Sequence, residues 1–326
     1  MSYAAGGPSA DRLAADGDVH RVPALRQVMR GNRVRFVETA RANLDLTWQS
    51  PEIIGGAAAW LAAVGADLVV ADHEPFVPRA ARRADVPVVA FSHQLILTET
   101  LPHVPLRHVP TALATALGIA VLAPRRPDAV VVPSFFFPRL RPGSRATLVP
   151  PIVRDDVLAT EARGGGPVVV YLNEGDGMAR LLDTLGAVDA PFRVYGLGPG
   201  AAPPNVRRCT PSRDGFLADL GAARAVVATA GFTLLSEALH LGKPVLALPN
   251  RGFFEQVVNA LALVDAGRGE AVVGRRLRAG DVAGFLARAD RYRRPPASAA
   301  DGRRGRQRAA DAIEAALRPA DRLVTA

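Results

Sequence analysis

The chain has 326 residues, of which 49% are hydrophobic by a broad count and 22% are charged. This composition is typical of a globular protein and excludes a chain that is disordered throughout, and the length suits two domains of about 100–200 residues each. A single cysteine, Cys209, excludes an intramolecular disulfide framework and a metal cluster built from several cysteines.

The formal net charge of +9 is carried almost entirely by arginine, since Lys243 is the only lysine in the sequence. The arginines are scattered along the chain and are not grouped with aromatic residues, so we expect no nucleic-acid partner. Those of the first half, such as Arg79, Arg82 and Arg126, leave a second hypothesis open, namely contact with an anionic lipid or a membrane surface.

The longest apolar stretches cover residues 113–123 and 225–230. Both are shorter than the ~20 residues that a membrane-spanning helix needs. No apolar run follows a charged start near Met1, so the pattern of a secretory signal is not met. We therefore expect a soluble, cytoplasmic protein, with peripheral contact to a membrane as the open alternative.

Short β-branched runs alternate with helical patterns, which indicates parallel βαβ units and an α/β fold. The expected strands of the first half cover residues 67–71, 87–91 and 129–132, and a short helix covers 78–85. The expected strands of the second half cover residues 167–172, 192–195, 205–209, 225–228 and 244–248, with helices at 178–187, 215–222 and 232–241.

Stretches rich in proline and glycine, at residues 137–144 and 160–167, separate the two halves. We expect a first domain over 1–152 and a second over 153–300. The segment 301–326 is expected to be a C-terminal helix and tail that packs back on the first domain. The helix itself is expected from about residue 306 to 317, after a polar segment at 297–305.

The start of the chain differs from the usual opening of a doubly wound domain, which is a hydrophobic strand, a glycine-rich turn and a helix. Residues 1–8 contain no strand of useful length before Gly6 and Gly7. We therefore expect the first domain to be shortened at its N-terminus.

The most informative segment covers residues 228–249. A strand ends at Ala228, Gly231 follows, and a helix begins at once. Free backbone N–H groups and the positive end of the helix dipole suit a diphosphate at this position. Glu237, about one turn further on, can accept hydrogen bonds from the vicinal hydroxyls of a ribose, or it is a solvated helix residue.

A second helix is expected to begin near Phe254. Glu255, Gln256 and Asn259 then cluster on its first turns at the same edge of the sheet. Carboxylate and amide side chains in such a cluster can fix the hydroxyls of a hexose. The alternative is helix capping with solvated polar residues.

The order Gly231-Phe-Thr-Leu-Leu-Ser-Glu237, then Gly242-Lys-Pro-Val, then Pro249 and Glu255-Gln256 with Asn259, resembles the donor half of nucleotide-sugar glycosyltransferases. These are enzymes of the GT-B fold, among them the bacterial peptidoglycan-precursor N-acetylglucosaminyltransferases and their relatives. The resemblance implies two Rossmann-like, doubly wound domains that face a cleft. It also implies that Glu237 binds the ribose, that Glu255 and Gln256 face the donor sugar, and that Gly231 lets the backbone approach the diphosphate.

A further element of the donor side is the glycine-containing turn at residues 173–177, after the strand that ends at 172. The amides of Gly175 and Gly177 can cradle a phosphate, and Asn173 can hydrogen-bond it. The resemblance places the nucleobase near the turn that begins at Thr210. The complete expected donor site comprises Asn173, Gly175, Gly177, Thr210, Ala230, Gly231, Phe232, Thr233, Glu237, Phe254, Glu255, Gln256 and Asn259.

Polar clusters also follow two strands of the first half. Asp72 and Glu74 come after the strand at 67–71, and His93 comes after the strand at 87–91. A glycosyltransferase that inverts the anomeric centre needs a base at the acceptor hydroxyl. His93, with an ordinary pKa near 6.5, suits that role at neutral pH, and Asp72 or Glu74 can act directly or orient the histidine. The alternative is that Asp72 is a turn residue and that His93 caps the next helix.

The sequence thus predicts an inverting glycosyltransferase that moves a hexose from a nucleotide diphosphate sugar, with uridine diphosphate as the expected nucleotide. We expect no metal and no cofactor besides the donor substrate, because helix N-termini can offset the diphosphate charge. The acceptor is a glycan, a lipid-linked precursor or a small natural product. Two alternatives share the architecture, a nucleotide-sugar 2-epimerase and a non-catalytic nucleotide-sugar binder. The sequence gives no indication of the oligomeric state.

Overall fold

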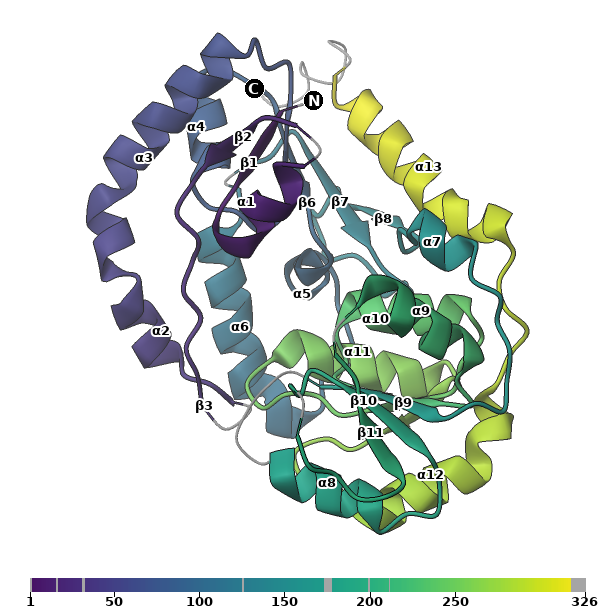
Figure 1. Cartoon of the computed structure of the whole chain (residues 1–326). Helices are drawn as coiled ribbons and strands as arrows, with labels where there is room; N and C mark the ends of the chain where they lie inside the picture. Colours follow the sequence, from purple (N-terminus) through teal and green to yellow (C-terminus); the bar gives the residue numbers. More distant parts are fainter. Residues whose placement is uncertain are drawn as a thin grey trace.

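The computed structural model describes residues 2–15, 17–30, 33–124, 126–172, 178–198, 200–210 and 212–317. Two lobes, each built on a parallel sheet, face each other (Figure 1). This is the expected α/β architecture. Among the described residues, no helix combines the length and the apolar composition that crossing a membrane requires.

The described part of the second lobe contains a six-stranded parallel sheet with the order β11-β10-β9-β12-β13-β14. This is the Rossmann order, in which the chain reverses direction along the sheet between β9 and β12. The central strands β9, β12 and β13 are buried on both faces, which explains their continuous apolar sequences. Their bounds are β9 (Val168–Tyr171), β10 (Phe192–Tyr195), β11 (Val206–Arg208), β12 (Val226–Ala228), β13 (Val245–Ala247) and β14 (Gly269–Ala271).

Helices cover both faces of this sheet. On one face, the apolar cluster packs α8 (Met178–Gly186) and α12 (Ala279–Tyr292) against the strands. On the other face lie α7 (Asp155–Leu158), α9 (Arg213–Ala222), α10 (Phe232–His240) and α11 (Phe254–Asp265). The second lobe is therefore doubly wound, as the sequence predicts.

The first lobe contains, within the described residues, a four-stranded parallel sheet with the order β5-β6-β7-β8. Its strands are β5 (Val69–Ala71), β6 (Val88–Phe91), β7 (Ala129–Pro133) and β8 (Thr147–Val149). The other elements of this lobe are β3 (Met29–Arg30), β4 (Arg33–Val34), α2 (Phe36–Ala42), α3 (Leu44–Ala63), α4 (Val77–Arg83), α5 (Ile96–Glu99), α6 (Val109–Leu122) and the 3₁₀ turns η1 (His93–Leu95) and η2 (Leu106–His108).

The expectation of a shortened first domain is not confirmed. The prediction that no strand precedes Gly6 and Gly7 is wrong. Residues Tyr3–Ala5 form β1, Gly6 and Gly7 turn the chain, and α1 (Gly7–Leu13) follows. β1 pairs in parallel with β2 (Val19–Arg21) in a separate small sheet. The strand is too short for its apolar pattern to stand out in the sequence, because a three-residue strand shows barely one period of alternation.

The C-terminal helix α13 (Ala299–Ala315) begins earlier than the expected residue 306. Ser298 caps it, since its hydroxyl accepts a hydrogen bond from the Asp301 backbone N–H at 3.1 Å. α13 returns from the second lobe to pack on β7 and β8 of the first (Figure 1). A Cβ at Gly305 would collide with the Pro151 carbonyl, so glycine there lets the helix lie close against the segment that joins the lobes.

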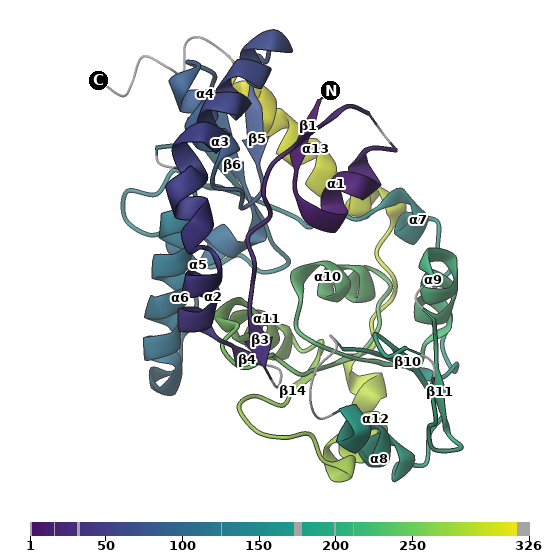
Figure 2. The ribbon, with the colours of Figure 1, turned by 60° about the vertical axis from the view of Figure 1, so that its left-hand side comes forward.

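The lobes also share an apolar cluster. Phe254, Val257 and Val258 of α11 pack with residues of the first lobe that include Ile96 and Ile119. Figure 2 shows α11 between the second sheet and the helices α5 and α6 of the first lobe. The helix that the sequence marks as part of the donor site therefore also packs against the first lobe.

Candidate active site

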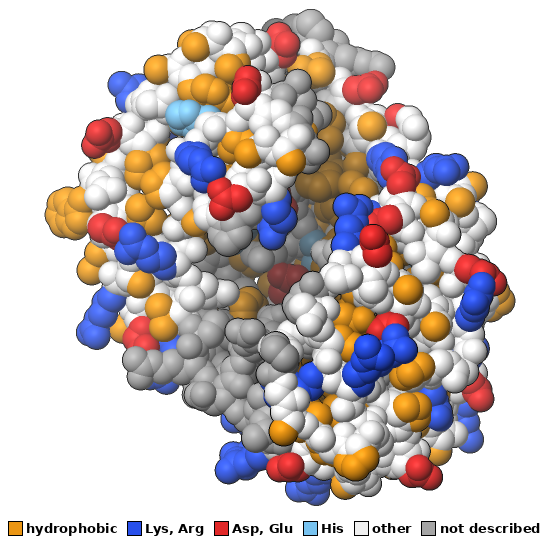
Figure 3. All heavy atoms as spheres, in the orientation of Figure 1, with side chains coloured by type: hydrophobic (Ala, Val, Ile, Leu, Met, Phe, Trp, Pro, Cys, Tyr) orange, Lys and Arg blue, Asp and Glu red, His pale blue; other side chains and the backbone are white. Residues whose placement is uncertain are grey.

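A cavity of about 860 Å³ lies at the carboxyl end of the second sheet, next to the point where the strand order reverses. We call it the switch-point cavity. Ligands of open α/β sheets bind in this position. Figure 3 shows a hollow between the lobes, with basic side chains at its rim. The lining residues are Arg12, Arg154, Tyr171, Tyr195, Ser212, Arg213, Phe216, Thr229, Gly231, Phe232, Thr233, Leu234, Glu237 and Gln256.

The start of α10 forms one wall of this cavity. Gly231 is the N-cap residue, with extended backbone angles (φ −68°, ψ 135°), and Phe232 and Thr233 begin the helix. The opposite face of α10 is held in the core by Leu235 and Ala238. Since the first N–H groups of a helix have no acceptor within it, this wall offers donors and a positive dipole end to an anion.

Glu237 lies one turn further along α10 and is 4% exposed. Its Oε1 accepts a hydrogen bond from Arg154 Nε at 2.9 Å. Burial raises the pKa of Glu237, and the charge of Arg154 and its hydrogen bond partly offset this effect. Arg213 lines the same cavity and pairs with Asp156 at 2.6 Å. The cavity thus combines one acidic side chain with arginines beside a helix N-terminus.

Aromatic side chains line another part of the switch-point cavity. The Phe216 ring contacts Tyr171 at 5.4 Å and Tyr195 at 5.0 Å between centroids, both edge-on. The Tyr195 hydroxyl donates to Asp219 at 2.5 Å, which fixes its ring. An apolar, aromatic surface of this kind suits a planar ring such as a nucleobase.

The residues of α11 have different environments. Gln256 lines the cavity, and its Oε1 accepts a hydrogen bond from the Asn250 backbone N–H at 2.8 Å. Phe254 does not line the cavity as expected, because its side chain is 2% exposed in the cluster shared by the lobes. Asn259 is fully buried and donates from Nδ2 to the Ala230 carbonyl at 3.1 Å.

His93 lies at the interface between the lobes and is 7% exposed. Its Nδ1 contacts the Pro133 carbonyl at 2.7 Å, and its Nε2 contacts Asn259 Oδ1 at 2.8 Å. The ring stacks on Phe232 with 3.9 Å between centroids. Burial lowers the pKa of His93 more than these hydrogen bonds raise it. Ser92, not His93, caps the following 3₁₀ turn. With both nitrogens engaged, the ring is not positioned to take a proton from an acceptor.

Asp72 follows β5 and is exposed. Burial raises its pKa, while a hydrogen bond with Ser92 and the charge of His73 lower it less. Glu255 of α11 lies near enough for the charge of Asp72 to act on it. Burial and that charge raise the pKa of Glu255 to about 7, against a hydrogen bond with Asn259. One carboxyl group from each lobe therefore lies within electrostatic range of the other, and both are candidates for proton transfer.

Glu74 has a structural role in this conformation. Its carboxylate oxygens accept hydrogen bonds from the backbone N–H groups of Phe76, at 2.9 Å, and Val77, at 2.6 Å, at the start of α4. Burial raises the pKa of Glu74, and these bonds oppose the shift. Both oxygens are occupied by the cap, whereas Asp72 of the same loop is exposed and has Ser92 as a side-chain hydrogen-bond partner.

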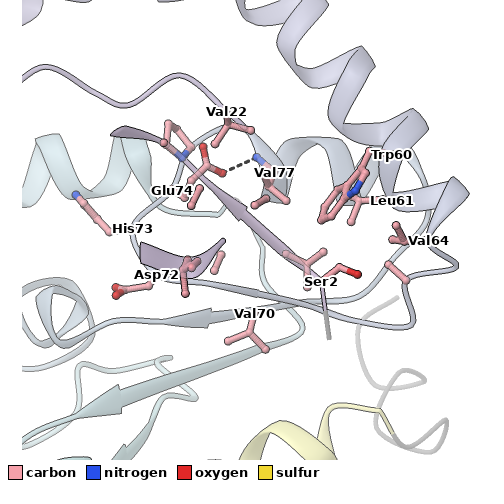
Figure 4. A pocket seen from close by; sticks show the side chains of 18 of the residues that line it. Ser2, Val22, Trp60, Leu61, Val64, Val70, Asp72, His73, Glu74 and Val77 are labelled. Atoms are coloured by element: carbon pink, nitrogen blue, oxygen red, sulfur yellow. Dashed lines mark hydrogen bonds between the residues drawn. The ribbon is translucent and has the colours of Figure 1, made fainter. Parts of the chain in front are cut away.

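A second cavity, of about 730 Å³, lies between β1 and β5, and we call it the β5 cavity. Figure 4 shows Asp72 and His73 at one end of it and Trp60, Leu61 and Val64 at the other. Val70 of the edge strand β5 is 47% exposed and also lines it. The cavity therefore has a polar end at the cleft and an apolar remainder.

Other expected donor residues contribute less. Asn173, Gly175 and Gly177 lie outside the described residues. Thr210 is exposed and is not among the residues that line the switch-point cavity. Ala230 contributes its carbonyl to the contact with Asn259.

A family model described as "Glycosyl transferase family 1" matches residues 3–290 of the sequence. The chain belongs to this family. It is a glycosyltransferase, which favours glycosyl transfer over the epimerase and the non-catalytic binder that the sequence left open. No curated protein matches the sequence.

Solved structures of similar fold include CalG4, described as the calicheamicin glycosyltransferase, with 19% identity and a TM-score of 0.61 over 100% of this chain and 91% of that one. LpCGTa, solved in complex with UDP, has 15% identity and a TM-score of 0.54 over 97% and 87%. MurG of Acinetobacter baumannii has 13% identity and a TM-score of 0.54 over 96% and 99%. At these identities the likeness shows the fold, and it confirms the expected GT-B resemblance.

Several residues that line the switch-point cavity of this glycosyltransferase were not predicted from the sequence. Arg154 lies in the segment that joins the lobes, and Tyr171 ends the strand β9. Ser212 carries a usable signal, since its hydroxyl accepts from the Gly215 N–H at 3.0 Å, a typical N-cap. The arginines carry none, because an arginine at a loop is most often a solvated surface residue.

Proposed function

We propose that this glycosyltransferase moves a hexose from a uridine diphosphate sugar to a hydroxyl of a largely apolar acceptor, with inversion and without a bound metal ion. The observation that carries the proposal is the switch-point cavity. In it, the N-terminus of α10, Arg154, Arg213, Glu237 and an aromatic wall surround one space of nucleotide size.

The charges of the cavity suit a nucleoside diphosphate. The free N–H groups of α10, with Arg154 and Arg213 nearby, can offset the pyrophosphate charge that a metal ion offsets in other enzymes. Glu237 supplies a carboxylate oxygen for the ribose hydroxyls, and the Phe216 and Tyr171 rings supply an apolar surface for the base. That LpCGTa binds UDP supports uridine as the nucleoside.

The proposed step is a single displacement. The acceptor oxygen attacks the anomeric carbon, and the bond from that carbon to the diphosphate oxygen breaks. The acceptor proton passes to the carboxylate of Asp72, and UDP leaves with the electron pair of the broken bond. Asp72 suits the base role better than His93 or Glu74, because it is exposed and makes one side-chain hydrogen bond, with Ser92. By contrast, both imidazole nitrogens of His93 and both carboxylate oxygens of Glu74 are engaged.

The β5 cavity supports the choice of acceptor. Its apolar end, at Trp60 and Leu61, suits a hydrocarbon or aromatic body, and its polar end brings a hydroxyl to Asp72. A small natural product meets both conditions. CalG4, described as the calicheamicin glycosyltransferase, is a structural neighbour that favours the same class over a glycan.

Two measurements test the proposal. Thermal unfolding with UDP-glucose, dTDP-glucose and GDP-mannose should show the largest stabilisation for the uridine donor, since ligand bound to the native state raises stability by mass action. Transfer to 2-naphthol should persist in EDTA and give a β-glycoside from the α-linked donor, by NMR. A requirement for added Mg²⁺, or an α-glycoside product, would contradict the mechanism.

The base is tested with Asp72→Asn. We expect turnover to fall about 10²- to 10⁴-fold, the usual contribution of a general base, while UDP binding by calorimetry stays unchanged. Asp183→Asn makes the same chemical change at an exposed position of α8 and should keep full activity. Full turnover in Asp72→Asn would remove this residue from the reaction.

A further inference from the structure

We propose that His93 is a positioning residue, which holds the turn at Ala230–Phe232 from the opposite lobe so that the start of α10 is ready to bind the donor diphosphate. The inference rests on the proposed function, because it assigns the diphosphate to that turn. It gives His93 a role different from the catalytic base that its position after β6 suggests.

Two contacts from His93 converge on this turn. The first is direct, since the imidazole lies on the Phe232 ring with 3.9 Å between centroids and 12° between planes. The second runs through Asn259, whose Oδ1 contacts His93 Nε2 at 2.8 Å and whose Nδ2 donates to the Ala230 carbonyl at 3.1 Å. The residues on either side of Gly231 are thus both held.

The contact between Asn259 and the Ala230 carbonyl determines the orientation of the Asn259 amide, and with it which nitrogen of His93 carries a proton. The Ala230 carbonyl requires the donor end of the Asn259 amide, so Oδ1 must point to His93 and accept from it. His93 therefore carries its proton on Nε2. Nδ1 lies 2.7 Å from the Pro133 carbonyl at the end of β7, and because a carbonyl only accepts, this second contact is a hydrogen bond when Nδ1 also carries a proton. The chain Pro133–His93–Asn259–Ala230 thus joins the end of a strand in one lobe to the diphosphate turn of the other.

The surroundings of His93 favour a fixed positioning role over proton transfer. Asn259 is fully buried, His93 is 7% exposed, and Phe136 closes the ring on its edge at 6.0 Å between centroids. Gly231 has no Cβ, so its own conformation is weakly restricted. Support from its neighbours keeps the N–H groups of α10 aligned before the ligand arrives, and such alignment raises affinity because less order is lost on binding.

The test compares two variants that each keep one nitrogen of the ring. His93→Gln places an amide nitrogen near the position of Nε2, facing Asn259, whereas His93→Asn places one near the position of Nδ1, facing Pro133. We expect His93→Asn to bind UDP about five- to tenfold more weakly than the wild type, the effect of a lost hydrogen bond, and His93→Gln to recover most of the affinity. Calorimetry without acceptor measures this binding, and KM for the donor should follow it while kcat changes little.

A double-variant cycle checks that the effect passes through Asn259. With Asn259→Ala as the partner, the losses of UDP affinity should be less than additive, because either change breaks the same chain of contacts. Additive losses would overturn the inference, and so would variants that bind UDP like the wild type but lose turnover, the result expected of a base. Equal losses in His93→Gln and His93→Asn, parallel to a lower Tm, would reduce His93 to a purely structural role. If the wild type binds no UDP, the proposed donor is wrong, and this inference falls with it.

Discussion

Arg154 contacts a single oxygen of Glu237 through two nitrogens, since Nε and Nη2 both lie 2.9 Å from Oε1. Arg154 belongs to the segment that joins the lobes, and its side chain is 43% exposed, whereas that of Glu237 is 5% exposed. The ion pair therefore orients the carboxylate without occupying Oε2. The residue expected to bind the ribose is thus aimed by an arginine from outside its own sheet.

Replacement of Glu237 by Gln should weaken UDP binding about tenfold or more, because the ribose hydroxyls lose a charged acceptor. Calorimetry with UDP measures the effect. Asp156→Asn is the matched control, since Asp156 contacts the same arginine, at 3.6 Å, and also Arg213, but does not line the cavity. Equal UDP affinity in Glu237→Gln and the wild type would count against the ribose contact.

Gln256 combines a structural contact with its place in the cavity. In Gln256→Ala the buried N–H of Asn250 loses its acceptor, so the free energy of unfolding should fall by about 1–3 kcal/mol in urea titrations. Gln256→Glu keeps an oxygen at that position and should stay within about 1 kcal/mol of the wild type. In this variant we expect a changed ratio of kcat/KM for UDP-glucose against UDP-N-acetylglucosamine. An unchanged ratio would separate Gln256 from the sugar.

Glu255 makes the stability of the protein depend on pH. Its pKa is raised from 4.5 to about 7 by burial and by the charge of Asp72. Because the pKa is raised in the folded state, protonated Glu255 adds its full contribution to the free energy of unfolding below pH 4.5. This contribution is lost as the pH rises to about 7. The loss amounts to at most about 3 kcal/mol, at about 1.4 kcal/mol per pKa unit. In Glu255→Gln, urea titrations at pH 5 and pH 8 should show a smaller loss than in the wild type, and an identical loss would refute the assignment.

Lys243, the only lysine, is 1% exposed and donates hydrogen bonds to backbone carbonyls at the C-terminal end of α9. Its ammonium donates to the carbonyls of Gly221, at 2.5 Å, and Ala223, at 3.1 Å, and to that of Arg163 in the segment between α7 and β9. In Lys243→Met these buried oxygens lose a charged donor, and we expect a loss of about 3 kcal/mol or more in urea unfolding. Arg293→Met, which removes a donor to the Arg224 carbonyl at 2.8 Å from a less buried side chain, should cost about 1 kcal/mol. Similar losses in both variants would contradict this role of Lys243.

The central strands of the second sheet could be predicted because they are buried on both faces. Val168–Tyr171 and Val226–Ala228 are continuous apolar runs, which are typical of buried parallel strands. The opening strand Tyr3–Ala5 was missed because it is short, and the helix α3, with Pro51 in its interior, because its pattern is weak. The start of α13 was misplaced because its polar first turns read as a loop.

The candidate site likewise contains residues that the sequence indicates and partners that it does not. A glycine followed at once by an amphipathic helix indicates an anion-binding turn, and the spacing from Gly231 to Glu237 and Gln256 is readable because all three belong to one sheet edge. Their partners are not readable, since Arg154 lies 83 residues from Glu237 and His93 lies 166 residues from Asn259.

The sequence by itself determined the α/β class and the edge of the sheet at which we propose that a nucleotide sugar binds, because periodicity and glycine turns are local properties of the chain. Only the tertiary structure decided which polar groups are free to act. A hydrogen bond across the lobes turns His93 from a candidate base into a support, and a helix cap occupies Glu74, whereas Asp72 stays open to the cleft. The role of an ionisable side chain depends on the partners that burial gives it, and those partners come from distant parts of the chain.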